Sequence, residues 1–461
     1  MQVPTVIFRQ YDIRGVVGKE ITPSVAQAIG RALATVARQR IGRVPRLTVG
    51  RDNRPSGEML ARAVREGIAA AGGIAVDVGM LPTPALYFAL HAPKVDGGLQ
   101  VTGSHNPPEF NGFKMVVAGE TLHGDDIQEL RGLIERDATD SGRGATEVDT
   151  TVLDRYVDAI VKRNAPLARS VKVVVDCGNG VASLVAERLL TRLGAEVVPL
   201  FCESDGTFPN HHPDPTVVEN LRDLQAAVRR TGAELGIAFD GDGDRIGAVD
   251  EQGSVVFGDQ LLILFGRDLV HRMGKGHHVI FDVKCSEVLK TELARSGLQP
   301  VIWKTGHSLI KAKMKELKAP LAGEMSGHVF FGGDYFGFDD ALFAAARLLA
   351  YVAREGGPLS ARLADVPKTF ATPEIRVDCP DERKFAIVES AARHFAQSYD
   401  VLTLDGVRIS FPEGWGLIRA SNTQPVLVLR FESKSEQTLQ HYRDEVEHWL
   451  AAQGVSTKPT H

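Results

Sequence analysis

Cysteine is rare in this sequence. The chain of 461 residues contains four cysteines, and none of them belongs to a C-x-x-C pair: Cys177, Cys202, Cys285 and Cys379. This spacing argues against a zinc knuckle or a dithiol redox motif. We therefore expect free thiols, buried in a protein of the reducing cytoplasm.

Long apolar runs and an excess of positive charge are missing as well. A membrane-spanning helix needs about 18 consecutive apolar residues, and every apolar run in this sequence is much shorter. Residues 1–8 lack a basic stretch followed by a long apolar one, so no secretion signal is expected. The net charge of −5 implies no general affinity for nucleic acid or for an anionic membrane. Any anion site must then be a local basic cluster.

What is present is a repeated alternation of strand-like and helix-like segments. At about 150 residues per domain, the length predicts three or four domains. Near the N-terminus, Thr22 and Pro23 read as the start of a helix that ends near residue 40. This alternation is typical of mixed or parallel sheets covered by helices, and its segments lie at 46–50, 56–71, 74–78, 96–101, 112–117, 171–176, 182–193, 260–273, 278–283 and 287–296.

The last part of the chain has a different pattern. Strand-like runs at 374–377, 407–411, 415–419 and 426–432 lie between helical patterns at 381–398 and 435–453, which predicts antiparallel strands. The fold class that we predict is α/β, with three similar α/β domains that have mixed sheets and a smaller C-terminal α+β domain. The predicted domains are 1–150, 151–253, 254–367 and 368–461.

The segment Thr102–Pro108 stands out among the loops. Ser104 lies at the tip of a tight turn between two strand-like runs, after Gly103 and before two prolines. Ligands bind at the carboxyl ends of strands in open α/β sheets. With His105 beside it and Lys114 ten residues later, Ser104 is a candidate nucleophile or phosphoryl carrier. A surface turn that happens to contain serine and histidine explains the seven residues equally well.

A second loop is rich in aspartate. Asp240, Asp242 and Asp244 alternate with glycine directly after a strand-like run, so all three carboxylates can turn toward one ion. Oxygen ligands of this kind suit Mg²⁺ or Ca²⁺. An EF-hand is disfavoured, because its sixth position is Arg245 instead of glycine and a strand precedes it. Three acidic ligands leave room for an anionic oxygen, which favours Mg²⁺ shared with a phosphate.

Two further loops carry binding groups. Glu324, Ser326 and His328 alternate, so on an extended chain they point the same way and suit adjacent sugar hydroxyls. The segment 419–425 combines arginine with small polar residues, which indicates an anion cradle or an ordinary Asn/Thr/Pro turn. Gly178-Asn179-Gly180 resembles a dinucleotide fingerprint only loosely, and we interpret it as a structural turn.

Together these loops resemble the α-D-phosphohexomutase family, and within it the bacterial group that acts on both mannose and glucose phosphates. The resemblance covers the whole chain, and its motifs occur in the family's order: Tyr11–Gly15, Thr102–Pro108, Asp240–Arg245, Gly323–His328 and Arg419–Pro425. It implies a heart-shaped monomer in which each domain contributes one loop to a central cleft. It also implies a cytoplasmic enzyme of carbohydrate metabolism.

The resemblance also implies roles for individual residues. Ser104 would carry a phosphoryl group, and Ser104, Asp240, Asp242 and Asp244 would hold Mg²⁺. Glu324, Ser326 and His328 would select the sugar. The phosphate that does not react would lie on Arg419, Ser421, Asn422, Thr423 and Arg430. The remaining cleft residues, which include the other catalytic candidates beside His105, would be Tyr11, Arg14, Lys114, Arg245, Lys284 and His307.

The reaction implied is reversible phosphoryl transfer between C1 and C6 of mannose or glucose phosphates through a hexose 1,6-bisphosphate. Lys114 or His307 would be the base, and Arg14 would keep Lys114 neutral by like-charge repulsion. The alternatives are a phosphoglucosamine mutase, a serine phosphatase acting on sugar phosphates, and a non-catalytic sugar-phosphate sensor. Phosphoglucosamine mutases tend to have alanine where this chain has Gly103.

Overall fold

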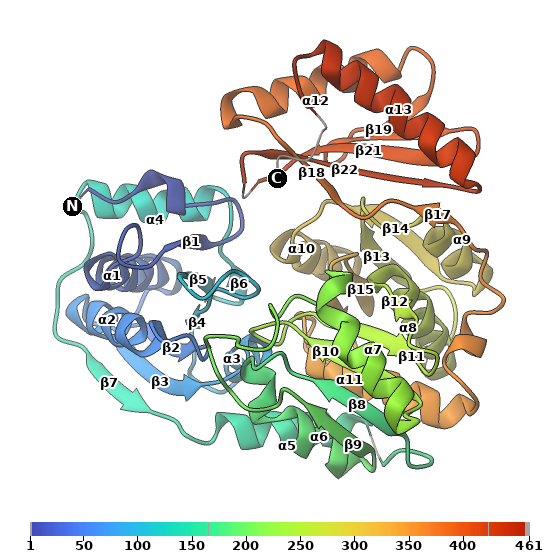
Figure 1. The fold of residues 1–461 in the computed structure, drawn as a ribbon. Coiled ribbons are helices and arrows are strands. Elements are labelled where there is room, and N and C mark those ends of the chain that lie inside the picture. The colour runs from blue at the N-terminus through green and yellow to red at the C-terminus, as the bar shows by residue number, and fades with distance from the viewer. Residues whose placement is uncertain (1, 165, 423, 457–461) are drawn as a thin grey trace.

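The computed structural model describes residues 2–164, 166–422 and 424–456. Four sheets follow one another along the chain, and Figure 1 shows the corresponding parts arranged in turn, from the blue N-terminal part through green and yellow to the red C-terminal part. No described helix combines the length and the apolar character needed to span a bilayer. The predicted fold class is confirmed by these mixed sheets.

The first sheet is mixed, with strand order β1-β5-β4-β2-β3-β7 and β6 beside β5. The strands β2, β3, β4 and β7 are parallel, and the hairpin of β4 and β5 is antiparallel. Its elements are β1 (Ile13–Val16), α1 (Pro23–Ile41), β2 (Arg46–Arg51), α2 (Gly57–Ala70), β3 (Ile74–Met80), α3 (Thr83–Ala89), β4 (Gly97–Val101), β5 (Phe110–Val117), β6 (Glu120–Thr121), α4 (Asp125–Glu135) and β7 (Ala145–Val148), after a 3₁₀ turn at Thr5–Ile7.

The second and third sheets are smaller and also mixed. The second has the order β12-β11-β10-β8-β9 and the third β14-β13-β15-β16. Their elements are α5 (Val152–Asn164), β8 (Lys172–Asp176), α6 (Ala186–Leu193), β9 (Glu196–Leu200), α7 (Arg222–Thr231), β10 (Leu235–Phe239), β11 (Ile246–Asp250), β12 (Val255–Val256), α8 (Gly258–Met273), β13 (His278–Asp282), α9 (Glu287–Arg295), β14 (Gln299–Trp303), α10 (His307–Leu317), β15 (Leu321–Gly323), β16 (Val329–Phe331) and α11 (Ala341–Glu355).

One helix differs from the prediction. The segment 182–193 was expected to be a single helix, but a 3₁₀ turn at Val181–Leu184 precedes α6. The backbone N–H of Val181 donates to the carbonyl of Gly241, 3.1 Å away, in the aspartate loop. This hydrogen bond ties the residue after the 178–180 turn to the aspartate loop.

The fourth sheet is antiparallel, with the order β17-β22-β21-β20-β19 and β18 beside β22. Helices α12 and α13 cover its outer face in Figure 1. Its elements are β17 (Phe370–Ala371), β18 (Ile375–Asp378), α12 (Asp381–Phe395), β19 (Asp400–Leu402), β20 (Val407–Phe411), β21 (Gly414–Ala420), β22 (Val426–Ser433) and α13 (Glu436–Ala452).

The hydrophobic cores show how these parts are joined. One continuous core includes residues of α3, of the second sheet and of the third sheet, whereas the fourth sheet has a core of its own. A small cluster of Val283, Trp415 and Leu417 connects the fourth sheet to the third. Arg408 donates there to the carbonyls of Val283 and Cys285, at 2.6 and 2.8 Å. The fourth part therefore contacts the third through the loop after β13, and the backbone N–H of Thr305, in the loop after β14, also donates to Asp405 at 2.9 Å.

Two helices of the first part pack with almost no space between their backbones. A Cβ added to Gly30 of α1 would lie 2.3 Å from the carbonyl oxygen of Val64 in α2. A Cβ on Gly67 of α2 would lie 2.1 Å from the carbonyl oxygen of Gln27. Only glycine permits this approach, because a methyl group would force the helices apart.

We expect Gly30→Ala to lower the free energy of unfolding by about 1–3 kcal/mol, because a rigid backbone oxygen occupies the space of the new methyl group. Gly132→Ala on α4 is the matched control, since its methyl would meet only the movable end of Arg136. Alanine there gains up to about 1 kcal/mol of helix propensity. Thermal melting checks both, and equal melting temperatures would contradict the argument.

Candidate active site

All four parts of the chain line one large cavity of about 1510 Å³. The residues at its wall include most of those that the sequence singled out. They are Tyr11, Arg14, Ser104, His105, Lys114, Arg245, Lys284, His307, Glu324, Ser326, His328, Arg419, Ser421, Asn422 and Arg430. Thr423 lies outside the described residues. Side chains separated by hundreds of residues thus share one cleft.

Ser104 lies in the loop between β4 and β5 and is only 1% exposed. Its φ of 49° is in the left-handed region, which is unfavourable for a residue with a Cβ. The Ser104 hydroxyl donates to Oδ2 of Asp240 at 2.9 Å, and Nδ1 of His105 lies 3.1 Å from the same Oγ. Burial lowers the pKa of His105 well below its usual value, and Arg245 lowers it further, so this ring is neutral.

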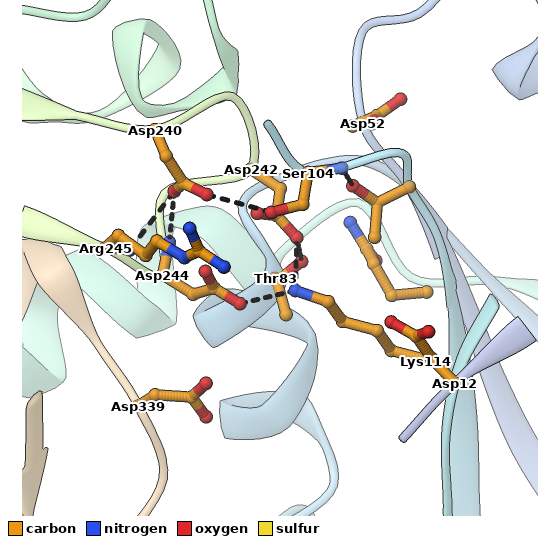
Figure 2. Close-up of polar contacts among 12 residues, drawn as sticks. Asp12, Asp52, Thr83, Ser104, Lys114, Asp240, Asp242, Asp244, Arg245 and Asp339 are labelled. Atoms are coloured by element: carbon orange, nitrogen blue, oxygen red, sulfur yellow. Dashed lines mark hydrogen bonds and ion pairs between the residues drawn. The ribbon is translucent and has the colours of Figure 1, made fainter. Parts of the chain in front are cut away.

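The three aspartates lie in the turn that joins β10 to β11, two antiparallel strands whose last pair is Phe239 and Ile246. This hairpin excludes an EF-hand, which requires helices. One oxygen from each of Asp240, Asp242 and Asp244 lies within 4.8 Å of the others, and all three residues are fully buried. Figure 2 shows the carboxylates gathered beside Ser104.

This cluster fits a hard divalent cation. Among the described residues, Oδ1 of Asp242 and Oδ1 of Asp244 are buried and have no hydrogen-bond partner. Burial raises the pKa of Asp240 well above its usual value, and the two neighbouring carboxylates raise it further. Three neighbouring carboxylates, two of which have an unpartnered oxygen, are a ligand set that Mg²⁺ or Ca²⁺ accepts.

Lys114 lies on β5 and contacts the same cluster. Its ammonium group donates to Asp242 at 2.7 Å and to Asp244. Burial lowers the pKa of Lys114, but the two carboxylates raise it well above its usual value. The expectation that Arg14 keeps Lys114 neutral is therefore wrong: Arg14 pairs with Asp12 at 2.7 Å, and Lys114 is charged.

A second group of possible ligands lies beside Arg245. Asp244, His328 and Asp339 lie within ligating distance of one another. However, the Nε–H of Arg245 donates to Nε2 of His328 at 3.0 Å, so the imidazole proton must be on Nδ1. That nitrogen lies 3.1 Å from Oδ2 of Asp339. The hydrogen bond to His328 fixes the orientation of the Arg245 side chain at the wall of the cleft.

The loop between β15 and β16 is a turn and not the extended segment that was expected. The N–H of Gly327, whose φ is 88°, donates to the carbonyl of Glu324 at 3.0 Å. The side chains of Glu324, Ser326 and His328 still reach the cleft wall. Glu324 accepts from the backbone N–H of Gly306 at 2.5 Å, which ties this loop to the start of α10.

His307 begins α10 and is 7% exposed. Neither of its ring nitrogens has a hydrogen-bond partner in the described part of the chain. Burial lowers its pKa well below the usual value, and the nearby Lys311 lowers it further. His307 is thus a neutral imidazole with free nitrogens at the wall of the cleft.

The C-terminal loop meets the N-terminal part through Tyr11. The side chains of Asn422 and Arg419 donate to the Tyr11 hydroxyl at 2.7 and 3.3 Å, and this hydroxyl donates to the carbonyl of Thr305 at 2.9 Å. Arg419 also pairs with Asp405 at 2.8 Å. This network joins the first, third and fourth parts across the cleft.

Lys284 and Arg430 lie where the third and fourth parts meet. The ammonium of Lys284 lies 3.3 Å from Glu374 and 3.8 Å from Asp282. Arg430 donates to the carbonyl of Lys284 at 2.6 Å. Both side chains reach the cleft while they also join the two parts.

Several residues of the site escaped the sequence analysis. Thr83 at the start of α3 donates to Asp242 at 2.5 Å, Asp339 orients His328, and Asp52 and Arg54 lie against the serine loop. None of them belongs to a motif, so no local pattern could have identified them. Only their contacts with distant residues do so.

Four domain models of one protein family match successive segments of this chain. Models of the family "Phosphoglucomutase/phosphomannomutase" match residues 5–141, 154–253 and 257–370 with its alpha/beta/alpha domains I, II and III. The model of its C-terminal domain matches residues 374–448.

Individual relatives cover almost the whole chain. A "Phosphomannomutase/phosphoglucomutase" of Pseudomonas aeruginosa is 49% identical over 442 residues, which are 96% of this chain and 94% of that protein. A "Phosphoglucomutase" of Neisseria gonorrhoeae is 44% identical and covers 95% of both chains. A crystal structure of a phosphoglucomutase/phosphomannomutase family protein from Burkholderia thailandensis is 44% identical, with a TM-score of 0.91, and covers 100% of this chain and 99% of that one.

We expect MgCl₂ to raise the melting temperature of the metal-free protein, because an ion that binds only the folded state stabilises it by mass action. Asp242→Asn should remove most of this increment, whatever its own metal-free melting temperature. Glu196→Gln is the control, since this carboxylate of β9 is 61% exposed and lies outside the cluster. A full increment in Asp242→Asn would show that Mg²⁺ binds elsewhere.

Proposed function

Since the chain belongs to the phosphoglucomutase/phosphomannomutase family and is a phosphohexomutase, we propose that it interconverts the 1- and 6-phosphates of mannose and glucose through phospho-Ser104. The observation that carries this proposal is the placement of the Ser104 hydroxyl. It is buried, it lies 2.9 Å from Asp240, and it opens into a cavity that all four parts of the chain line.

The proposed reaction has two phosphoryl transfers. In the first, the bond between phosphorus and Oγ of phospho-Ser104 breaks, a bond to the free sugar hydroxyl forms, and the hydroxyl proton moves to a base. The resulting hexose 1,6-bisphosphate turns end over end inside the cleft. In the second, Oγ of Ser104 takes the other phosphoryl group, and the proton returns to the sugar oxygen. A free 1,6-bisphosphate would activate an enzyme that has lost its phosphoryl group.

Loose transition states of this kind require positioning and neutralisation of charge. Asp240, Asp242, Asp244 and a phosphate oxygen on Ser104 would hold Mg²⁺, and the ion would supply positive charge to the transferring group. Lys114 is charged and lies against the same carboxylates, and the Arg245 side chain is held at the cleft wall by His328. These side chains support the proposal that the site is built for an anion beside a cation.

For the base we propose His307. A base must be neutral before it accepts a proton, and the burial that lowers the pKa of His307 supports this state at pH 7. Lys114, the other candidate, is held charged by its two carboxylates. The free nitrogens of His307 support its role, since they are available to a sugar hydroxyl.

The rest of the cleft would hold the substrate. We propose that Glu324, Ser326 and His328 contact the sugar hydroxyls, and that Arg419, Ser421, Asn422, Thr423 and Arg430 bind the phosphate that does not react, with Tyr11, Arg14 and Lys284 around it. We further propose a cytoplasmic monomer with domains near 1–150, 151–253, 254–367 and 368–461. The small size of the apolar cluster between the third and fourth parts supports a hinge there, which would give the intermediate room to turn.

Ser104→Ala should abolish mutase activity on glucose 1-phosphate and mannose 1-phosphate, because no carrier for the phosphoryl group remains. Intact mass should show one removable phosphoryl group in the natural enzyme and none in the variant. Calorimetry should still detect substrate binding. Turnover by Ser104→Ala without added bisphosphate would refute the carrier role.

The same assays separate the alternatives. Release of inorganic phosphate faster than isomer formation would indicate a phosphatase. A preference for glucosamine 1-phosphate would indicate a phosphoglucosamine mutase.

His307→Asn should lower kcat by about 10²–10⁴-fold with little change in KM, because loss of a base affects the chemical step. The pKa direction gives an independent check. Since the pKa of His307 lies well below its usual value, its ring should remain neutral when the pH falls from 8 to 6.5. Nuclear magnetic resonance of labelled histidine follows this, with the signal assigned by its loss in the variant. A midpoint at or above pH 6.5 would contradict the proposal.

A further inference from the structure

Arg54 is completely buried at the boundary between the first and second parts, and the sequence analysis gave it no role. It follows β2, and its side chain has 0% exposure. Burial of a charge this deep is unfavourable unless every polar atom is paired. The hydrogen-bond acceptors of Arg54 therefore indicate its role.

Four of those partners are backbone carbonyls of the loop that carries Ser104. Nη2 donates to the carbonyls of Ser104 and Asn106, at 2.8 and 2.5 Å, and Nη1 donates to those of Pro107 and Phe110, at 2.5 and 3.1 Å. The guanidinium is a planar fork with fixed donor directions. One rigid group thus sets the positions of carbonyls spread over seven residues.

Asp52 completes a clamp on the serine loop; the clamp consists of the hydrogen bonds that Arg54 and Asp52 make to residues 103–110. It accepts from Nε of Arg54 at 3.1 Å and, with the same oxygen, from the backbone N–H of Gly103 at 3.0 Å. A Cβ on Gly103 would lie 2.5 Å from Cζ of Arg54, so the guanidinium lies directly against this backbone and a larger residue would have to displace it. The residues on both sides of the Ser104 amide are fixed in this way.

The second part of the chain seals the clamp. The ring of Phe208 lies 5.2 Å from Cζ of Arg54. A Cβ on Gly241, between the first two aspartates, would lie 2.4 Å from the carbonyl oxygen of Ser104. That carbonyl therefore lies between the guanidinium and the aspartate loop. The contact sets the distance between the serine and the carboxylates.

We propose that Arg54, oriented by Asp52, is a positioning residue for phosphoryl transfer, which holds Ser104 in its left-handed conformation with Oγ toward Asp240. Left free, Ser104 would leave a φ of 49° for an extended or helical one, and Oγ would turn away from the carboxylates. In-line transfer tolerates little displacement, since a shift of about 1 Å can lower the rate about 100-fold. This inference rests on the proposed function of Ser104.

We expect Arg54→Ala to lower kcat about 100-fold while KM for glucose 1-phosphate changes less than about threefold, because the proposed groups for the sugar and the second phosphate lie on other loops. Guanidinium ion at millimolar concentration should restore part of kcat, since it can occupy the vacated space and donate to the same carbonyls. The enzyme is measured with Mg²⁺ and hexose 1,6-bisphosphate present.

Arg65→Ala is the matched control. Arg65 lies on α2 in the same part of the chain and is 9% exposed, but its partners are Glu58 and Asp77, both at 3.0 Å. This variant should lose stability and keep kcat, with no response to guanidinium. An Arg54→Ala enzyme with unchanged kcat, with a defect confined to KM, or with no rescue by guanidinium would overturn the proposal.

Two further variants cover the case in which Arg54→Ala does not fold. Arg54→Lys keeps the charge without the fork, and Gly103→Ala pushes the guanidinium away without removing it. Both should lower kcat at constant KM, and unchanged kcat in both would overturn the clamp. Ser104→Ala separates the two proposals: if it remains active, the proposed function fails, whereas an inactive Ser104→Ala beside a fully active Arg54 variant removes only the role of Arg54.

Discussion

The hydrogen bond from the Ser104 hydroxyl to Asp240 is the contact on which the rest of the structure depends. It joins a loop of the first sheet to a loop of the second, and neither loop would be stable in its conformation alone. Ser104 has a positive φ, and three aspartates converge where burial opposes their charge. Thr83 and Lys114 of the first part donate to Asp242 in the second part. Arg54 donates to the carbonyl of Ser104 and so holds the serine loop.

The electrostatics of the site follow from the same arrangement. Lys114 is buried beside Asp242 and Asp244; these carboxylates raise the pKa of Lys114, and Lys114 lowers the pKa of Asp242 against the effect of burial. Among the described residues, neither His105 nor His307 forms an ion pair with a carboxylate, and burial lowers the pKa of both rings and leaves them neutral. One cleft thus contains a charged ammonium group and neutral imidazoles, and the difference arises from what each side chain contacts.

The fourth part is connected to the molecule in a different way from the first three parts. Residues of the first three parts share one hydrophobic core, whereas the fourth contacts the third through a small apolar cluster and through polar contacts of Arg408, Arg430, Asp405, Glu374 and Glu432. Tyr11 contacts the fourth part through hydrogen bonds of its hydroxyl with Asn422 and Arg419. These contacts support the hinge that we propose between the third and fourth parts.

The sequence by itself determined the alternating α/β pattern, the antiparallel C-terminal part and the loops of Ser104, of the aspartates and of Glu324. These signals are local, because a glycine between aspartates or a turn after an apolar run acts through neighbouring residues. Only the tertiary structure decided that the 323–328 loop is a turn, that Lys114 is charged, and that Arg54 and Asp339 belong to the site. Those properties depend on burial and on partners far away in the chain, such as the residues 50 to 56 positions after Arg54, and no local pattern specifies them.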